Sequence, residues 1–198
     1  TDWAHLLVTA EAATGLLVTA MITGAVFAKF ARPTARVLFS DNILIGRFDG
    51  RRALRFRVAN ARDSHLVEAH INVTLTLAET TAEGHPFRKL YDLTLRRETS
   101  PIFSLSWSII HFIDEDSPLF GLSAQDLEAA QATFLTTLRG TDEVLVQNVH
   151  ARHAYTWADI AWDRRFVDVL SRNAQGGLRL DYTKFHETLP QSDPDGPD

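Results

Sequence analysis

The sequence predicts a mainly β protein, an antiparallel β-sandwich preceded by one transmembrane α-helix. Near the start of the chain, a mostly apolar run of about 25 residues extends from Leu6 to Phe30, and roughly 20 suffice to cross a hydrocarbon core about 30 Å thick. Beyond Pro33, apolar and polar residues alternate with a period of two, which is typical of strands with one buried face. The length of 198 residues fits one domain with an appendage.

A signal peptide, a buried core helix and a membrane span are the three interpretations of the apolar run. A signal peptide begins with basic residues, whereas here Lys29, Arg32 and Arg36 follow the run. Gly15 and Gly24 fit close packing in lipid, where glycine is more common than in soluble helices. We therefore predict a membrane span rather than a buried helix.

The basic residues after the run predict its orientation, because Lys and Arg are enriched on the cytoplasmic side. Pro33 lacks an amide proton and is expected to end the helix. The predicted organisation is a span over 1–32, a linker over 33–38, a cytoplasmic domain over 39–190 and a disordered acidic tail over 191–198.

Four positions of the run recur every four residues and so lie near one helix face. They are Gly15, Thr19, Thr23 and Phe27. This face is small and weakly polar until it reaches the phenylalanine ring, so it is either a packing face or the lining of a pore. Glu11, a carboxylate in or near the membrane, indicates a function or a partner.

Alternating strand patterns and turn residues predict the sandwich. Segment 53–60 alternates apolar residues with arginines, and 71–79 alternates them with Asn and Thr. Asp49-Gly50 and Glu83-Gly84 are typical of hairpin turns, and 173–177 joins two further runs. Short strands at this spacing favour an antiparallel sandwich.

One helix is expected to interrupt the strands. Ser123 fits an N-cap with Asp126 three positions later, so a helix is predicted to open the segment 124–134.

Composition and motifs exclude several classes of function. A net charge of −5 and a pI near 5.9 give no basic field for nucleic acid. The absence of cysteine excludes disulfides, thiolate zinc sites and cysteine nucleophiles. The sequence also lacks a Gly-rich phosphate loop, G-x-S-x-G and H-E-x-x-H. We expect no enzymatic activity and no nucleic-acid partner.

The remaining polar clusters have plain structural interpretations. His150 and His153 lie in an alternating segment, 143–155, where residues three apart face opposite sides, so no metal site is predicted. The acidic run Asp114–Asp116 is interpreted as a turn rather than a cation site. A further cluster, interpreted as a solvated strand face or as a contact with lipid headgroups, consists of Arg51, Arg52, Arg55, Arg57 and Arg62.

Several segments carry a resemblance to a known family. HFIDEDSPLFGLSAQDL, SHLVEAHI, FARPTARVLFS, ARHAYTWADIAW and LDYTKFHET resemble inward-rectifier potassium channels, especially their prokaryotic members, from about Glu11 to about Leu189. The resemblance implies an inner pore-lining helix and an immunoglobulin-like β-sandwich, with four copies around a cytoplasmic extension of the potassium path. It further implies a bacterial inner-membrane protein, and we expect it to be grouped with voltage-gated channels.

The resemblance implies roles for residues of the helix. Gly15 matches the inner-helix hinge, and Phe27 matches the constriction at the bundle crossing. Thr19 matches the rectification position and has no charge, which predicts weak block by magnesium or polyamines. Lys29, Arg32 and Arg36 match the lipid-headgroup segment, which implies anionic lipids or phosphoinositides as partners.

The resemblance also implies a cytoplasmic pore. Residues 140–149 match a loop that narrows it, with Glu143 and Arg152 either bracing the loop as an ion pair or stabilising an ordinary hairpin. Glu83 matches an acid of the vestibule, and Arg139 stands where polyamine-binding members have a second acid.

The 198 residues contain no T-x-G-Y-G filter, which we therefore expect upstream of Thr1. The predicted function is the gate and regulatory domain of a homotetrameric channel, with potassium as the permeant ion and no cofactor. The alternatives are a single-span β-sandwich binding or scaffolding protein without a pore and, more remotely, a soluble hydrolase using Asp114 or His150.

Overall fold

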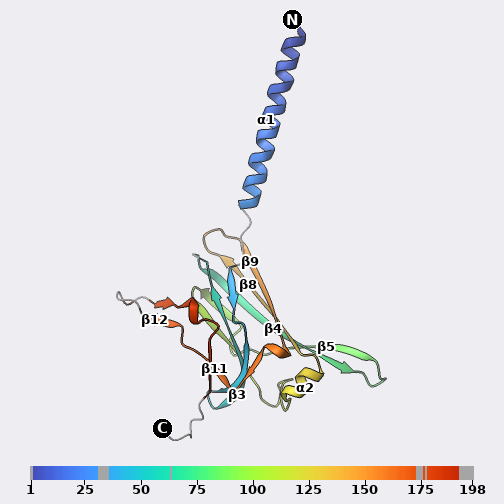
Figure 1. The fold of residues 1–198 in the computed structure, drawn as a ribbon, viewed down its shortest axis with the longest axis vertical. Coiled ribbons are helices and arrows are strands. Elements are labelled where there is room, and N and C mark those ends of the chain that lie inside the picture. Colours follow the sequence, from blue (N-terminus) through green and yellow to red (C-terminus); the bar gives the residue numbers. More distant parts are fainter. Residues whose placement is uncertain (1, 31–35, 63, 173–175, 177, 192–198) are drawn as a thin grey trace. The chain divides into compact units, whose positions relative to one another are not determined.

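The computed structural model describes residues 2–30, 36–62, 64–172, 176 and 178–191. The chain divides into two compact units, residues 1–34 and residues 35–198, and each is described by itself (Figure 1).

The first unit is a single helix, α1, Asp2–Phe30. At 1.5 Å per residue it is about 43 Å long, and it is long and apolar enough to cross a bilayer, with a mean hydropathy of 1.7. Hydroxyls along the helix donate to backbone carbonyls four residues earlier, at 2.7–2.8 Å, in Thr9, Thr14, Thr19 and Thr23. These bonds satisfy the hydroxyls within the helix, which suits a lipid environment.

The first sheet of the second unit is built around one long central strand. β3 pairs along one edge with β7 and along the other with β1 and β2, and β10 joins β2 at the margin. The strands are β1 Val37–Phe39, β2 Ile43–Phe48, β3 Arg51–Asn60, β7 Ser106–Phe112 and β10 Ile160–Trp162. The β10–β2 pair is parallel, so the prediction of a wholly antiparallel sandwich is wrong at this margin.

The second sheet repeats this arrangement around β4. One edge of β4 pairs with β8, and the other pairs with β5 and β6, while β9 completes the sheet beside β8. The strands are β4 Leu66–Thr80, β5 Pro86–Asp92, β6 Thr99–Phe103, β8 Thr133–Asp142 and β9 Asn148–Thr156.

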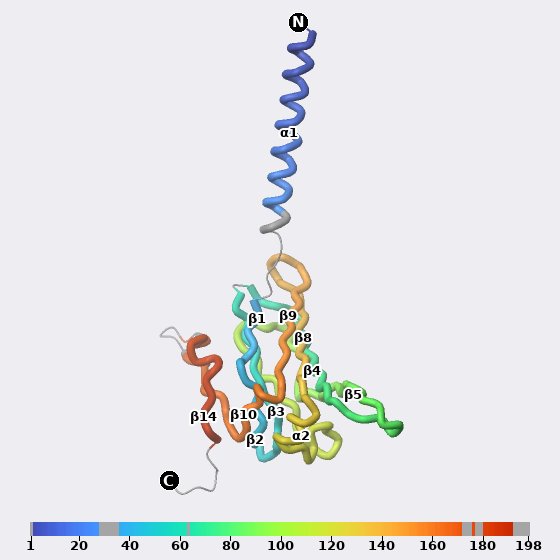
Figure 2. Tube along the Cα trace, turned by 45° about the vertical axis from the view of Figure 1, so that its right-hand side comes forward, coloured from blue at the N-terminus to red at the C-terminus, as the bar shows by residue number. Residues whose placement is uncertain are grey.

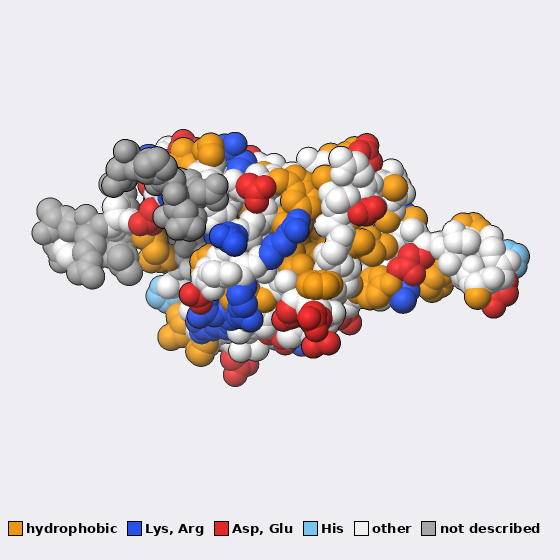
Figure 3. Space-filling view, turned by 90° about the horizontal axis from the view of Figure 1, so that it is seen from below, with side chains coloured by type: hydrophobic (Ala, Val, Ile, Leu, Met, Phe, Trp, Pro, Cys, Tyr) orange, Lys and Arg blue, Asp and Glu red, His pale blue; other side chains and the backbone are white. Residues whose placement is uncertain are grey.

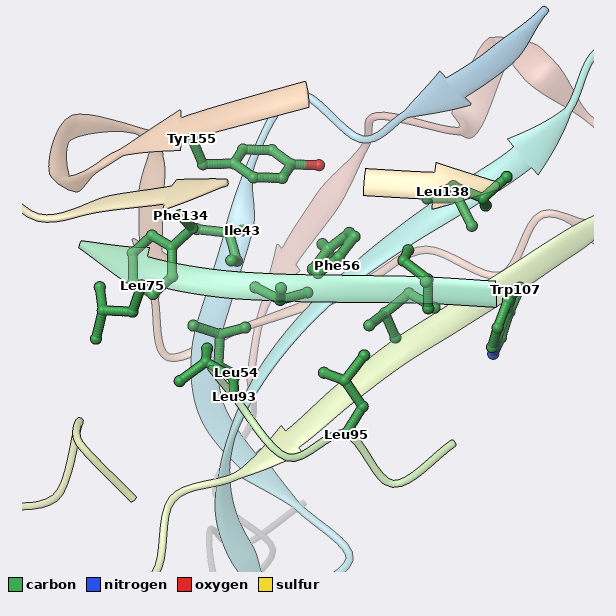
Figure 4. Packing of buried hydrophobic residues seen from close by; sticks show 14 of the residues in the cluster. Ile43, Leu54, Phe56, Leu75, Leu93, Leu95, Trp107, Phe134, Leu138 and Tyr155 are labelled. Atoms are coloured by element: carbon green, nitrogen blue, oxygen red, sulfur yellow. The ribbon is translucent and has the colours of Figure 1, made fainter. Parts of the chain in front are cut away.

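The hydrophobic core lies between the two sheets (Figure 4). Alternate apolar residues of β3 and β4 belong to it, and Leu54, Phe56 and Leu75 are completely buried. Phe134 and Tyr155 close the core from β8 and β9. Burial of the apolar faces of both sheets drives their association, and the mainly β prediction is confirmed.

The C-terminal strap, residues 164–191, runs beside the first sheet (Figure 2, orange to red). It consists of β11 Arg164–Phe166, β12 Leu170–Arg172, β13 Leu178–Leu180, the 3-10 helix η2 Tyr182–Lys184 and β14 Thr188–Pro190. β11 pairs with β14, and β12 pairs with β13.

The strap buries a side chain that the sequence analysis predicts to be exposed to solvent. Arg57 is only 4% exposed, and its guanidinium donates to the carbonyls of Phe185 at 2.6 Å and Val167 at 2.7 Å. The prediction of a solvated face is therefore wrong at Arg57. Gln191, predicted to start the tail, also belongs to the strap, because its side-chain amide donates to the Arg47 carbonyl at 2.6 Å. The tail beyond it, 192–198, lies outside the described residues.

The predicted turns and helix are largely as expected. Asp49 and Gly50 both have positive φ, 53° and 74°, as a two-residue β2–β3 turn of this kind requires, and Gly84 has φ 86° between β4 and β5. The turn over 173–177 lies mostly outside the described residues, although β12 and β13 on either side of it pair.

The interrupting helix is shorter than its pattern suggests. α2 covers Ala124–Ala129, and Ser123 caps it by accepting a hydrogen bond from the Asp126 amide at 3.3 Å. Gln131 then adopts φ 48°, and the chain enters β8, where Phe134 is fully buried. Core packing of Phe134 thus ends the helix before the expected position.

Candidate pore-lining helix and cytoplasmic loop

The four candidate pore residues form a narrow stripe along α1. Gly15, Thr19, Thr23 and Phe27 are four positions apart, so the stripe drifts by only about 40° per step. The Thr19 and Thr23 hydroxyls donate to the Gly15 and Thr19 carbonyls at 2.8 Å. Phe27 is 74% exposed in the single chain. The stripe therefore offers small, uncharged surface that ends in one large ring.

Only part of the basic segment after the helix is described. The Lys29 side chain and all of Arg32 lie outside the described residues. The Arg36 side chain is exposed, and its carbonyl accepts a hydrogen bond from the Ala61 amide at 2.8 Å. The backbone of Arg36 is thus hydrogen-bonded to the residue that follows β3, while its side chain is exposed.

The candidate pore loop, residues 140–149, is held in place by one buried carboxylate, that of Asp142 at the end of β8. Its Oδ1 accepts hydrogen bonds from the amides of Val144 and Leu145, each at 2.9 Å. Its Oδ2 accepts from the Ser64 hydroxyl at 2.5 Å and lies 2.8 Å from Nη2 of Arg62. Because these donors stabilise the charged form, Ser64 first among them, the pKa of Asp142 falls to about 2.

The tip of this loop is apolar and strained. Val144, Leu145 and Val146 are 69%, 52% and 79% exposed. Val146 adopts φ 50°, a left-handed conformation that is unfavourable for a β-branched residue. Its amide donates to the Asp142 carbonyl at 2.9 Å, so the turn around Asp142 maintains the strain. Backbone strain of this kind is concentrated at functional loops.

Gly140 lets β8 approach an irregularity in β4. The β4–β8 register shifts between Val67 and His70, where Glu68 has φ 51°. A Cβ on Gly140 would lie 3.3 Å from the Ala69 Cα and from the Val67 carbonyl oxygen. A larger residue would push β8 away from this bulge, so glycine fixes the position at which the loop leaves the sheet.

The predicted ion pair between Glu143 and Arg152 is absent from the single chain. Glu143 instead lies 2.7 Å from Nδ1 of His65, and its amide donates to the His65 carbonyl at 3.1 Å. Arg152 is opposite Thr137 in the β8–β9 register, and Asn148 starts β9 four residues earlier. At about 3.3 Å per residue, Arg152 is too far along the strand to reach the turn.

The other two candidate pore residues lie apart on the second sheet. Glu83 is exposed in the β4–β5 turn, and its pKa is lowered by a hydrogen bond from the Thr81 side chain. Arg139 is exposed on β8, in register with His70 and His150. The sheet therefore separates Glu83, at one end of β4, from the loop that follows Arg139, at the other.

The histidines of the motifs have structural roles. His153 stacks on Phe39 with ring centroids 5.2 Å apart, whereas His150 is exposed. No three His, Asp or Glu residues converge anywhere in the described part of the chain. His111 is buried and links the Thr94 carbonyl, 2.8 Å from its Nδ1, to the Ser117 hydroxyl, 2.7 Å from its Nε2.

This histidine holds the acidic turn, a role that the sequence analysis missed. Nδ1 must donate to the Thr94 carbonyl, so the neutral ring accepts from Ser117 through Nε2. Burial lowers the pKa of His111 and favours that neutral form. Asp114–Asp116 are exposed beside it, as the interpretation of a turn predicts. A lone His within the apolar run SIIHF is the signal that could have indicated a buried anchor.

Comparison with known proteins decides the family. The family model of the inward rectifier potassium channel C-terminal domain matches residues 37–196. The chain belongs to the inward-rectifier potassium channel family. It is 44% identical over 184 residues to the inward rectifier potassium channel Kirbac3.1 of Paramagnetospirillum magnetotacticum, which covers 93% of this chain and 62% of that protein.

Vertebrate inward rectifiers are also similar to this chain. ATP-sensitive inward rectifier potassium channel 12 of Gallus gallus and inward rectifier potassium channel 18 of Homo sapiens are each 36% identical over 192 residues. In both comparisons the match covers 93% of this chain and 44% of the relative. The chain therefore spans less than two thirds of the length of these inward rectifiers.

Family membership confirms two expectations and overturns one. The resemblance to inward rectifiers is confirmed, and the relatives are ion channels, so the chain is not an enzyme. The grouping with voltage-gated channels is wrong, because inward rectifiers are not voltage-gated.

Proposed function

We propose that this inward-rectifier chain forms the pore-lining helix, the gate and the cytoplasmic regulatory domain of a homotetrameric potassium channel in a bacterial inner membrane. The observation that carries the proposal is the stripe on α1, which ends in the exposed ring of Phe27. In a fourfold arrangement, four such rings would meet on the axis, and an apolar constriction closes by dewetting. Gly15, which lacks a Cβ, supplies the bending point.

A second constriction is proposed at the candidate pore loop. Val144–Val146 present apolar side chains on a turn that Asp142 fastens to the chain before β4 through Arg62 and Ser64. Arg36 is bonded to Ala61, next to Arg62. A ligand that moves Arg36 would therefore act on the segment that holds the loop, which gives a route from the membrane surface to the constriction.

The ligands of this channel follow from its charges. Lys29, Arg32 and Arg36 are proposed to bind anionic lipids, phosphoinositides among them. Thr19 brings no charge to the pore and Arg139 brings a positive one, which leaves Glu83 to attract cations. We therefore propose weak block by magnesium and polyamines, with potassium as the permeant ion and no cofactor.

Potassium flux in liposomes that contain the channel protein tests the gate. Phe27→Ala removes the proposed constriction and should raise flux severalfold. Val18→Ala is the matched control, because nine residues of helix place Val18 on the face opposite Phe27. Equal flux in the wild type and both variants would show that Phe27 does not close the path.

A further inference from the structure

A cavity of about 360 Å³ lies on the first sheet, between the outward side of β3 and β7 and the start of the C-terminal strap. It is large enough for a small organic phosphate. The polar side chains that line it are Arg55, Arg57, Arg165, Ser106, Ser108 and Asp168. Three of these are cationic and one is anionic, so the lining carries a net positive charge.

One of the polar side chains, that of Arg57, already has several hydrogen-bond partners. Arg57 donates to three strap carbonyls, those of Val167, Lys184 and Phe185, at 2.6–2.9 Å. Burial lowers the pKa of Arg57 to about 10, and Asp168 and Glu187 offset this lowering only in part. The requirements of Arg57 are thus largely met by the fold.

The guanidinium of Arg55 has fewer hydrogen-bond partners than that of Arg57. Its Nη2 donates to the Arg164 carbonyl at 3.0 Å, and its guanidinium lies 5.1 Å from the centre of the Phe48 ring. Its Nε is buried and has no hydrogen-bond partner among the described residues. Burial lowers the pKa of Arg55, and no nearby acid offsets this effect. A buried donor without a partner is unfavourable, so the fold leaves the Nε donor of Arg55 available to a ligand.

Two serine hydroxyls line the cavity on the same side as Arg55. Ser106 and Ser108 come from β7, next to β3, and neither hydroxyl donates to or accepts from another side chain or carbonyl of the described residues. Hydroxyl and guanidinium donors on one wall suit an oxyanion, because charge-assisted hydrogen bonds to such groups are short and strong.

We propose that this cavity binds a small phosphate-bearing anion, with Arg55 as its main cationic contact and Arg165, Ser106 and Ser108 as additional donors. The cavity lies on the first sheet, whereas the candidate pore loop leaves the second sheet, so in the proposed channel it constitutes a regulatory input apart from that loop. The phosphate can belong to a soluble ester or to a lipid headgroup.

Thermal unfolding of the chain in detergent, with inorganic phosphate and glycerol phosphate as probes, tests the site. A ligand that binds only the folded state raises Tm in a saturable way. Arg55→Met keeps the length of the side chain and removes the unpaired charge, so its Tm without phosphate should equal or exceed that of the wild type. Its affinity for phosphate should fall at least tenfold.

Arg47→Met is the matched control. Arg47 is exposed on β2 and does not line the cavity, so this variant has the same change in net charge and should keep the affinity of the wild type. Binding to phosphatidylglycerol vesicles, compared with phosphatidylcholine vesicles, separates the sources. If binding to vesicles depends on Arg55 and soluble phosphate does not bind, the ligand is a lipid headgroup. A saturable Tm shift that survives Arg55→Met overturns the proposal, and so does the absence of Arg55-dependent binding both to soluble phosphate and to vesicles.

Discussion

The carboxylate of Asp142 shows how one residue shapes a functional loop. It is completely buried, and it joins the turn over 142–147 to Ser64 and Arg62. The sequence alone does not indicate this, because Asp142 and Ser64 are 78 residues apart. Pairing of β4 with β8 brings them together.

Asp142→Ala should destabilise the domain strongly. The substitution leaves Arg62 and two loop amides without their acceptor, and breaking a buried pair in this way costs about 3 kcal/mol. Denaturant unfolding measures the loss. Glu143→Ala removes the neighbouring exposed pair with His65 and should cost less than about 1 kcal/mol. Equal losses in the two variants would contradict the role of Asp142.

The pH dependence of stability should report the same carboxylate. The pKa of Asp142 is about 2 in the folded chain, against an ordinary value of 3.8. The unfolded chain therefore binds the proton more readily, and the stabilisation is complete above pH 3.8 and is lost as pH falls toward 2. The stability advantage of wild type over Asp142→Asn should therefore shrink as pH falls from about 4 to about 2. A constant difference over this range would contradict the assignment.

Single-residue errors in the sequence analysis have one common cause. Alternation along β3 correctly identifies Leu54 and Phe56 as core residues, because strand periodicity is local. It cannot show that the strap covers Arg57 from more than 100 residues away. The pairing of Glu143 with His65 likewise depends on strand register, which the spacing in the sequence does not reveal.

At the scale of elements, the candidate pore loop combines strain with exposure. Val146 has φ 50°, and a non-glycine residue held in such a conformation costs of order 1–3 kcal/mol. Val146→Gly should therefore raise the free energy of unfolding by roughly 1 kcal/mol after the entropy of glycine in the unfolded chain is subtracted.

Val144→Gly provides the control for this prediction, because Val144 is also exposed at the tip but is not among the residues with positive φ. It should lower stability slightly. The same change in the free energy of unfolding for both variants would mean that the loop stores no strain at Val146.

Elements whose signals are local are predictable, and those that depend on packing are not. The Asp49-Gly50 turn and the Ser123 cap are both present, because each depends on the conformation of two to four adjacent residues. The sequence analysis places the end of α2 too late, because burial of Phe134 overrides helix propensity. It places the start of β9 too early, because the turn around Asp142 extends to Gln147.

At the scale of the whole molecule, the hairpin of β4 and β5 projects from the second unit (right-hand side of Figure 3). Its outer strand is almost entirely exposed, and Phe87 and Leu90 are 54% and 62% exposed. Because these two residues are three apart on one strand, they face opposite sides of the hairpin, and the proposed tetramer would have to cover both sides.

Substitution of both residues should weaken assembly but not folding. Phe87→Ser with Leu90→Ser should shift the chain in detergent from tetramer toward monomer, as measured by light scattering. Its circular dichroism should be unchanged. Leu189→Ser, at an exposed apolar residue of the strap, should leave the tetramer intact. A double variant that remains fully tetrameric would exclude this hairpin from the interface.

The central claim is that four copies of α1 surround a conduction path that closes at Phe27. The 198 residues contain no cysteine, so a thiol introduced at position 27 or 18 is the only thiol in this part of the channel, and the protein without either substitution is the control for labelling elsewhere. In liposomes that contain the channel protein, a charged, water-soluble thiol reagent should reduce potassium flux through Phe27→Cys channels and leave Val18→Cys channels unaffected. If the reagent leaves the potassium flux of both variants unchanged, the account is contradicted, because the residue at position 27 would then not face the path.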